Sequence, residues 1–174
     1  SVTCDVSDYE AVKAVAQSLR KEKREIEGLV NAAGIASMNL AVTTPPSMTQ
    51  KLIQTNLAGT IHCCQLFAPL MIRKKAGSMI NFSTIAVTLG LKGESIYAAS
   101  KAGVEGFSRA FAREMADFDI RVNCISPGYV WTPLVENQIP DTMKARNMSR
   151  EEVIDQVLLA KQPTKKFVQP EDIG

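Results

Sequence analysis

Short apolar runs alternate along the chain with longer segments whose apolar residues recur at helical spacing. The short runs predict buried strands, because each is bounded by Gly, Asn, Ser or Asp. They are residues 2–6, 28–32, 79–82 and 122–125. The longer segments, which predict helices, are residues 8–23, 47–74, 95–117 and 149–160. Strands that alternate with helices favour parallel pairing through right-handed crossovers. The pattern therefore predicts an α/β fold with a doubly wound parallel sheet in three layers, α/β/α.

The composition is that of an ordinary globular domain. The chain has 174 residues, of which 45% are hydrophobic and 22% charged, with a formal net charge of +2. This length fits one domain, and this charge predicts no nucleic-acid partner. The apolar stretch at residues 66–72 is interrupted by Pro69 and is far shorter than the roughly 20 apolar residues that cross a bilayer. We therefore expect no membrane partner, no membrane span and no signal peptide.

The four cysteines, Cys4, Cys63, Cys64 and Cys124, predict neither a disulfide nor a metal site. They form no Cys-x-x-Cys pair and lack the alternating Cys/His spacing of a zinc site. We expect them to be small buried apolar residues in a reducing compartment, the cytoplasm or alternatively the mitochondrial matrix.

Polar residues follow several of the predicted strands, where a doubly wound sheet binds its ligands. Ligands of such sheets lie at the carboxyl ends of the strands. The residues at these positions are Asp5, residues 31–34, residues 83–84 and residues 127–132. The sequence thus predicts a site built from several segments that are far apart in the chain.

Tyr97 and Lys101 form the strongest chemical signal. They open the helix predicted at residues 95–117, and their separation of four residues puts the phenol and the ammonium on one helix face. A free tyrosine has a pKa of about 10, and a neighbouring cation lowers it toward neutral pH. Tyr97 could then act as a general acid or base on an alcohol or a ketone. By itself, such a pair is more often an exposed feature of a helix surface.

Three further features give the pair a chemical context. Thr84 lies thirteen residues before Tyr97 and follows a predicted strand, where its hydroxyl could hold a substrate oxygen. The turn at residues 31–34 follows another strand and could line a cofactor channel. Asn56 lies inside a predicted helix, where asparagine is a mediocre helix former and usually has a specific role.

In order and separation, these residues closely resemble the short-chain dehydrogenase/reductase family. The resemblance covers essentially the whole chain and implies a Rossmann-type fold. It also implies an enzyme that acts on CH–OH groups, with NAD or NADP as cofactor and a small-molecule carbonyl or alcohol as substrate. The motifs are Cys4-Asp5-Val6, Asn31-Ala32-Ala33-Gly34, Asn56, Ser83-Thr84, Tyr97-x-x-x-Lys101, Arg121-Val122-Asn123 and Pro127-Gly128 with Thr132.

The resemblance implies a role for each matching residue. Tyr97 would donate the proton, Lys101 would bind the nicotinamide ribose and lower the pKa of Tyr97, and Thr84 would orient the carbonyl. Asn56 would hold a water molecule that links Lys101 to solvent. The implied cofactor contacts, besides Tyr97 and Lys101, are Asp5 and Val6 at the adenine, Asn31, Ala33 and Gly34 along the adenosine and ribose, and Pro127, Gly128, Val130 and Thr132 at the nicotinamide.

The chain departs from the family pattern at its site and at its ends. The usual residue at position 84 is serine, and Ser83 is a weaker candidate for its role because it should point to the opposite side of the strand. The glycine-rich turn that binds a pyrophosphate at a helix N-terminus is absent from these residues. We therefore expect residues 1–174 to form a single, incomplete domain that lacks the first strands and the last strand, in a protein of roughly 250 residues.

The substrate segments resemble two groups within the family. Residues 31–127 resemble 3-oxoacyl thioester reductases, and residues 128–167 are similar to 3-hydroxybutyrate dehydrogenases, in which Gln138 would help bind a carboxylate. Glu94 stands where the second group has a lysine, and it would repel a small anion. We therefore expect a 3-hydroxyacyl/3-oxoacyl pair of the thioester type, with 3-hydroxybutyrate as the alternative. Ser83, Glu94, Trp131 and Gln138 are the candidate substrate residues.

Alternatives remain open for the function of the protein and for the role of Trp131. A non-catalytic dinucleotide-binding or assembly module could keep the fold without turnover. The helices at residues 47–74 and 97–117 resemble those that pair subunits in the family, which implies a homo-oligomer, a dimer or a tetramer. Trp131 could equally be a core or interface aromatic.

Overall fold

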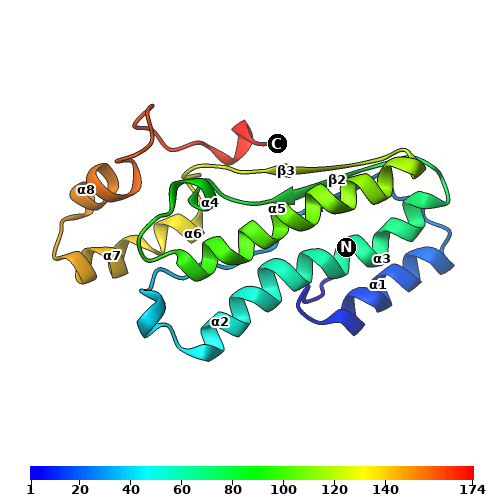
Figure 1. Ribbon diagram of the computed structural model, residues 1–174, viewed down its shortest axis with the longest axis horizontal. Coiled ribbons are helices and arrows are strands. Elements are labelled where there is room, and N and C mark those ends of the chain that lie inside the picture. Colours follow the sequence, from blue (N-terminus) through cyan, green and yellow to red (C-terminus); the bar gives the residue numbers. More distant parts are fainter. The chain divides into compact units, whose positions relative to one another are not determined.

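The computed structural model describes residues 1–174, except for the side chain of Ala145. The chain forms two compact units, Ser1–Ser126 and Pro127–Gly174 (Figure 1). Each unit has its own apolar core and is described by itself. That residues 1–174 make up one incomplete domain stays a prediction.

The first unit is built on a three-stranded parallel sheet. Its strands are β1 (Gly28–Asn31), β2 (Gly77–Phe82) and β3 (Ile120–Ile125), in the order β1-β2-β3. In the central strand, Ile80 lies opposite Val30 of β1 and Asn123 of β3. The parallel pairing confirms the predicted sheet and brings the carboxyl ends of all three strands to the same edge.

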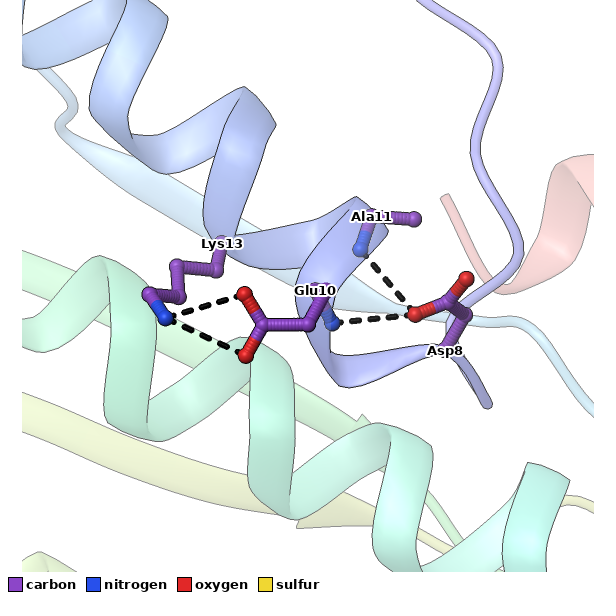
Figure 2. Close-up of polar contacts among 4 residues, drawn as sticks. All are labelled: Asp8, Glu10, Ala11 and Lys13. Atoms are coloured by element: carbon purple, nitrogen blue, oxygen red, sulfur yellow. Dashed lines mark hydrogen bonds and ion pairs between the residues drawn. The ribbon is translucent and has the colours of Figure 1, made fainter.

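Helix α1 (Tyr9–Lys21) begins where the sequence predicts it, because Asp8 caps its N-terminus. One carboxylate oxygen of Asp8 accepts hydrogen bonds from the backbone N–H groups of Glu10 at 3.0 Å and Ala11 at 3.1 Å (Figure 2). One turn into the helix, Lys13 pairs with Glu10 at 2.9 Å. These contacts satisfy N–H groups that a helix start otherwise leaves without partners.

The helix predicted at residues 47–74 is interrupted by a π-helical segment. It consists of α2 (Pro46–Leu52), the π segment η2 (Ile53–Ala58) and α3 (Gly59–Ile72). A short 3₁₀ helix, η1 (Ala41–Thr43), precedes it. Apolar periodicity predicts the extent of the segment but not the widened turn, because both helix types leave similar apolar faces.

Helix α5 (Ser95–Met115) confirms the predicted helix around Tyr97. The short helix α4 (Ala86–Leu89) comes before it, and the 3₁₀ helix η3 (Ala116–Phe118) follows it. Helices α3 and α5 pack on the sheet, and α1 lies beside α3 (Figure 1). The core between these helices and the strands contains Cys64, Ala68, Met71, Met79, Phe111, Met115, Ile120 and Val122.

Within this unit the described helices cover one face of the sheet. On the other face, Val30 is 61% exposed, and Ile80 and Phe82 are half-buried. The second helical layer that the sequence analysis predicts is therefore not seen among the described residues of the first unit. The alternation of inward and outward side chains along β2 and β3 gives each strand one buried face.

The strand predicted at residues 2–6 is not formed. A strand needs a neighbour to take up its backbone hydrogen bonds, and the three-stranded sheet does not include these residues. This segment lies instead against the helical segment at residues 53–72. Gln54 donates its side-chain amide to the carbonyl of Ser7 at 3.0 Å, and a ring nitrogen of His62 lies 3.3 Å from the carbonyl of Val6.

The second unit is helical around a small apolar core. Its helices are α6 (Pro133–Glu136), α7 (Ile139–Arg146), α8 (Arg150–Glu152), the π segment η4 (Val153–Leu158) and the 3₁₀ helix η5 (Pro170–Asp172). Ser149 and Glu152 form a capping box at the start of α8, which is close to the predicted start at residue 149. A parallel bridge joins Val130 to Val168.

The cysteines differ from the expectation of uniform burial. Cys63 and Cys64 are buried and Cys124 is half-buried, but Cys4 is exposed, because residue 4 lies in the unpaired segment rather than in a strand. All four are free. Burial raises the pKa of Cys63 to about 11 and that of Cys64 to about 12, so both thiols stay protonated at neutral pH.

Within the described residues, the structure has neither a membrane-spanning helix nor a cluster of metal ligands. No described helix is long and apolar enough to cross a bilayer. No group of three or more His, Cys, Asp or Glu side chains among these residues could hold a metal ion.

Candidate active site

The structure brings Tyr97 and Thr84 together beside the end of β2. Tyr97 lies in the first turn of α5, and Thr84 follows β2 by two residues. Burial of the phenol raises the pKa of Tyr97, the negative charge of Glu94 raises it further, and a hydrogen bond between the Tyr97 and Thr84 side chains lowers it by less. The net effect is a raised pKa, so the phenol is protonated at neutral pH.

Lys101 turns toward the sheet. Its amine donates a hydrogen bond to the carbonyl of Phe82, the last residue of β2, at 2.8 Å, and the residue is only 5% exposed. Burial lowers the pKa of this amine. Burial and Glu94 dominate the surroundings of the phenol and raise its pKa, and the role of Lys101 in lowering the pKa of Tyr97 stays a prediction.

Asn56 lies in the π segment η2 and is fully buried. Its amide oxygen accepts from the backbone N–H of Ile35 at 2.8 Å, and its amide nitrogen donates to the carbonyl of Ile35 at 2.9 Å. The nitrogen also donates to the Ser100 hydroxyl at 3.1 Å, and this hydroxyl donates to the carbonyl of Tyr97 at 2.7 Å. Asn56 is thereby connected to the backbone of Tyr97 through one side chain. Its water-holding role stays a prediction.

The turn at residues 31–34 lies beside the amine of Lys101 and the side-chain amide of Asn56. A Cβ atom added at Gly34 would lie 3.4 Å from Lys101 Nζ and 3.4 Å from Asn56 Oδ1. The absence of a side chain at Gly34 therefore leaves the backbone of this turn close to both polar groups. Ala33 and Gly34 are exposed, which is compatible with a lining role that stays a prediction.

The side chain of Asn31 points into the core rather than toward the site. Its amide donates to Asn81 Oδ1 at 2.8 Å and lies 3.3 Å from Cys64 Sγ. Asn81 in turn donates to the Ser108 hydroxyl at 2.8 Å. This network connects β1, β2, α3 and α5. Because the side chain of Asn31 is engaged in it, Asn31 would contact a cofactor through its backbone.

Asp5 and Val6 lie just before helix α1. Asp5 is exposed, and one of its carboxylate oxygens accepts from the backbone N–H of Ser7 at 2.9 Å and from its hydroxyl at 2.7 Å. These hydrogen bonds lower the pKa of Asp5. Val6 packs so closely on Gly59 that a Cβ atom there would lie 2.8 Å from Val6 Cγ2. Contacts of Asp5 and Val6 with an adenine stay predictions.

The remaining predicted residues belong to the second unit. Thr132 precedes α6, and its hydroxyl donates to the carbonyl of Val130 at 3.4 Å. The Trp131 ring lies 4.8 Å from that of Phe167, which supports the reading of Trp131 as a core aromatic of this unit. The cofactor roles of Pro127, Gly128, Val130 and Thr132 and the substrate roles of Trp131 and Gln138 stay predictions.

Sequence reasoning missed Glu105, which interacts with Ser83. The Ser83 hydroxyl donates to Glu105 Oε1 at 2.7 Å, so a substrate role for Ser83 would require this bond to break. Glu94 is 8% exposed and lies just before α5. A signal for Glu105 is present in the sequence, because Tyr97, Lys101 and Glu105 recur at intervals of four residues on one helix face.

The chain is similar to known proteins along its whole length. A family model described as enoyl-(acyl carrier protein) reductase matches residues 1–174. The chain is 37% identical over 146 residues to D-beta-hydroxybutyrate dehydrogenase of Rhizobium meliloti, and the matched region covers 84% of this chain and 57% of the relative. It is 34% identical over 170 residues to a 3-oxoacyl-(acyl-carrier-protein) reductase of Thermotoga maritima, and the matched region covers 98% of this chain and 64% of the relative. The chain thus spans less than two thirds of either relative.

Solved structures confirm the Rossmann-type α/β fold. Sorbitol-6-phosphate 2-dehydrogenase from Erwinia amylovora matches with a TM-score of 0.91 and 25% identity, over 99% of this chain and 68% of that one. A single-residue variant of actinorhodin polyketide ketoreductase, solved with NADPH, matches with a TM-score of 0.91 and 26% identity, over 99% of this chain and 66% of that one.

Proposed function

This chain belongs to the short-chain dehydrogenase/reductase family, and from that we propose that the protein carrying it interconverts a secondary alcohol and a ketone with a nicotinamide dinucleotide. The observation that carries the proposal is the contact between the Tyr97 phenol and the Thr84 hydroxyl, with Lys101 one helical turn away. Two hydroxyl groups that meet at a substrate oxygen can orient a carbonyl and protonate it.

The cofactor is NAD or NADP, and a relative solved with NADPH supports the second. Lys101 and the backbone of Gly34 fit its ribose, because an ammonium group has three N–H donors and the carbonyl of Phe82 takes one. The bound dinucleotide would supply the hydride for ketone reduction or accept it from an alcohol. Comparing turnover with NADH and NADPH tests which form is used.

In the proposed reduction, the Thr84 hydroxyl donates to the carbonyl oxygen and holds the carbonyl in place. When hydride reaches the carbonyl carbon, the electron pair of the C=O double bond moves to the oxygen. The Tyr97 phenol then transfers its proton to that oxygen and is left as a phenolate, which regains a proton from solvent. The raised pKa of Tyr97 keeps the phenol protonated at neutral pH, which is the form that the proposed reduction requires.

We propose a 3-oxoacyl thioester as the substrate and free 3-oxobutyrate as the alternative. One relative that is 34% identical to the chain is named as a 3-oxoacyl-(acyl-carrier-protein) reductase, and another that is 37% identical is named as a D-beta-hydroxybutyrate dehydrogenase. The negative charge of Glu94, which acts on Tyr97, favours the thioester because a free carboxylate near the reacting carbon would be repelled. Turnover of acetoacetyl thioester and of acetoacetate should be compared, and a strong preference for the free acid would overturn this assignment.

Tyr97→Phe tests the proposed function directly. The variant removes one oxygen from the site, and we expect the rate of ketone reduction to fall by a factor of about 10² to 10⁴, the usual contribution of a general acid. Tyr9→Phe is the control, because Tyr9 is a 40% exposed tyrosine outside the site. A Tyr97→Phe protein that keeps most of its turnover would show that Tyr97 is not the proton donor, whereas a parent protein without turnover would favour a non-catalytic module.

We also propose that the protein is a homo-oligomer and is located in the cytoplasm. Helices α2, α3 and α5 correspond to the segments that resemble subunit-pairing helices, and all four cysteines are free. Light scattering coupled to gel filtration would give the oligomeric state. A monomeric protein would contradict the first part of this proposal, and a secreted protein the second.

A further inference from the structure

Glu105 lies on α5 one turn after Lys101, and its carboxylate is turned inward. Its side chain is only 19% exposed, although the side chain of Arg109, one turn later, is 74% exposed. Oε1 accepts from the Ser83 hydroxyl at 2.7 Å and from the Ser126 hydroxyl at 3.3 Å. Oε2 lies 3.6 Å from the guanidinium of Arg109. One carboxylate oxygen is thus shared by two hydroxyl groups.

These two serines stand at equivalent places in the sheet. Ser83 comes directly after β2, and Ser126 comes directly after β3. The backbone N–H of Ser83 donates to the carbonyl of Ile125 at 2.8 Å, which extends the pairing of the two strands by one step. Glu105 therefore joins the carboxyl ends of two neighbouring strands to the helix that carries Tyr97.

A second hydrogen bond joins α5 to Phe82, the residue before Ser83. Lys101 Nζ donates to the carbonyl of Phe82 at 2.8 Å, and Glu105 accepts from Ser83. Helix α5 consequently holds two consecutive residues at the end of β2. Thr84 is the next residue, so the position of its hydroxyl relative to Tyr97 depends on these two bonds.

We propose, on the basis of the proposed function, that Glu105 is a positioning residue that sets the placement of Thr84 relative to Tyr97. Its carboxylate does this through Ser83, and it touches neither of the two reacting hydroxyl groups itself. Small displacements of a reacting group have large effects on rate, since a shift of about 1 Å can cost about 10²-fold. The proposal therefore predicts a defect in turnover rather than in cofactor binding.

The first test compares Glu105→Ala with Glu105→Gln. The alanine variant removes the acceptor, and we expect kcat to fall by about tenfold to 10²-fold, with KM for the dinucleotide within about twofold. The glutamine variant keeps an acceptor oxygen of the same reach, and we expect it to keep kcat within about threefold. Glu114→Ala is the matched control, because Glu114 is exposed on the same helix.

Outcomes of this comparison separate positioning from a charge effect. Glutamine is uncharged, so a positioning role predicts the same pH profile of kcat for Glu105→Gln and the parent protein. An equal loss in the glutamine and alanine variants would overturn the proposal. So would a kcat of Glu105→Ala that matches that of Glu114→Ala.

The second test uses Ser83→Ala, which removes the other partner of the bond. We expect kcat to fall in the same direction, and the double variant Ser83→Ala/Glu105→Ala to be no slower than Glu105→Ala alone, because the two changes remove one shared bond. Losses that multiply would overturn the proposal. If Glu105→Ala does not fold, Ser83→Ala carries the test, and full activity in that variant would overturn the proposal.

Failure of this proposal differs from failure of the proposed function. If the parent protein turns over neither a ketone nor an alcohol, the proposed function is wrong, and if Tyr97→Phe keeps its turnover, Tyr97 is not the proton donor. If Tyr97→Phe loses turnover while Glu105→Ala behaves like Glu114→Ala, the function stands and the positioning role is wrong. Thermal unfolding of each variant sets an assay temperature at which all of them are folded.

Discussion

At the scale of single residues, the surroundings of Tyr97 favour the protonated form of its phenol. Burial removes water from the phenol and Glu94 adds a negative charge nearby, and both effects disfavour the phenolate. The sequence alone predicts the opposite shift, because it shows Lys101 at the right spacing but not the carbonyl of Phe82 that the lysine binds. The candidate acid is thus visible in the sequence, and the direction in which its pKa shifts is not.

Replacing Glu94 by glutamine should make Tyr97 more acidic. The change removes the negative charge that raises the pKa of Tyr97, so the phenol loses its proton at a lower pH. Because reduction needs the protonated phenol, the alkaline limb of the reduction profile should move to lower pH. The measurement is kcat/KM for ketone reduction as a function of pH, with Glu114→Gln as control. An unchanged limb would mean that Glu94 does not act on Tyr97.

Thr84 should tolerate serine but not alanine. The threonine hydroxyl interacts with Tyr97, and its oxygen accepts from the backbone N–H of Ala86 at 3.2 Å. Thr84→Ser keeps the hydroxyl and removes a methyl group that restricts its rotamer, so activity should be equal or higher. Thr84→Ala should lower kcat by about 10²-fold. Steady-state kinetics of both variants check this, and equal activity in the two would transfer the role to Ser83.

At the scale of elements, the strands and long helices could be predicted because their apolar residues recur at the proper period. The segment at residues 2–6 has the composition of a strand, but no partner strand lies beside it in the sheet. The π segment and the bond between Glu105 and Ser83 could not be predicted, since each depends on which element packs against which. The spacing of Tyr97, Lys101 and Glu105 marks the helix face without identifying its neighbour.

The contact between α3 and the segment before α1 should be sensitive to a single methyl group. A Cβ atom at Gly59 would lie 2.8 Å from Val6 Cγ2 and 3.2 Å from the carbonyl oxygen of Val6, so the backbone at Val6 must move. We expect Gly59→Ala to destabilise the fold by about 1–3 kcal/mol.

Gly106→Ala is the matched control, because nothing lies within 4 Å of the atom added there. It should stabilise α5 by about 0.5–1 kcal/mol, since alanine is the better helix former. Urea unfolding of both variants measures the difference. A stabilising effect of Gly59→Ala would contradict the close packing of Val6.

At the scale of the whole molecule, the first unit presents one open face of its sheet. Helices α3 and α5 cover the opposite face, and Val30 is 61% exposed in the middle of strand β1. Two layers of this fold can be predicted from the alternation of strands and helices. The uneven covering of the sheet cannot, because the strand pattern is the same whether a second layer is present or not.

The open face should make the 174-residue chain bind a hydrophobic dye such as ANS. Val30→Thr should lower the dye fluorescence, because it removes apolar surface from a patch that also contains the half-buried Ile80 and Phe82. Val42→Thr is the control, since Val42 is 91% exposed but lies in a short 3₁₀ helix away from the strands. Equal fluorescence in the two variants would show that the sheet face is not the binding surface.

The π segment at Ile53–Ala58 also limits how the chain can change in length. A π turn contains one residue more than an α turn, and each residue of a helix turns the chain by about 100°. Because the wide turn accommodates the extra residue, deleting one residue there would leave a regular helix whose two flanking parts keep nearly the same rotational phase. A deletion between this segment and Cys64 has no wide turn to absorb it, so it would rotate Cys64 by about 100° relative to Asn56, and the two could no longer face their present partners together.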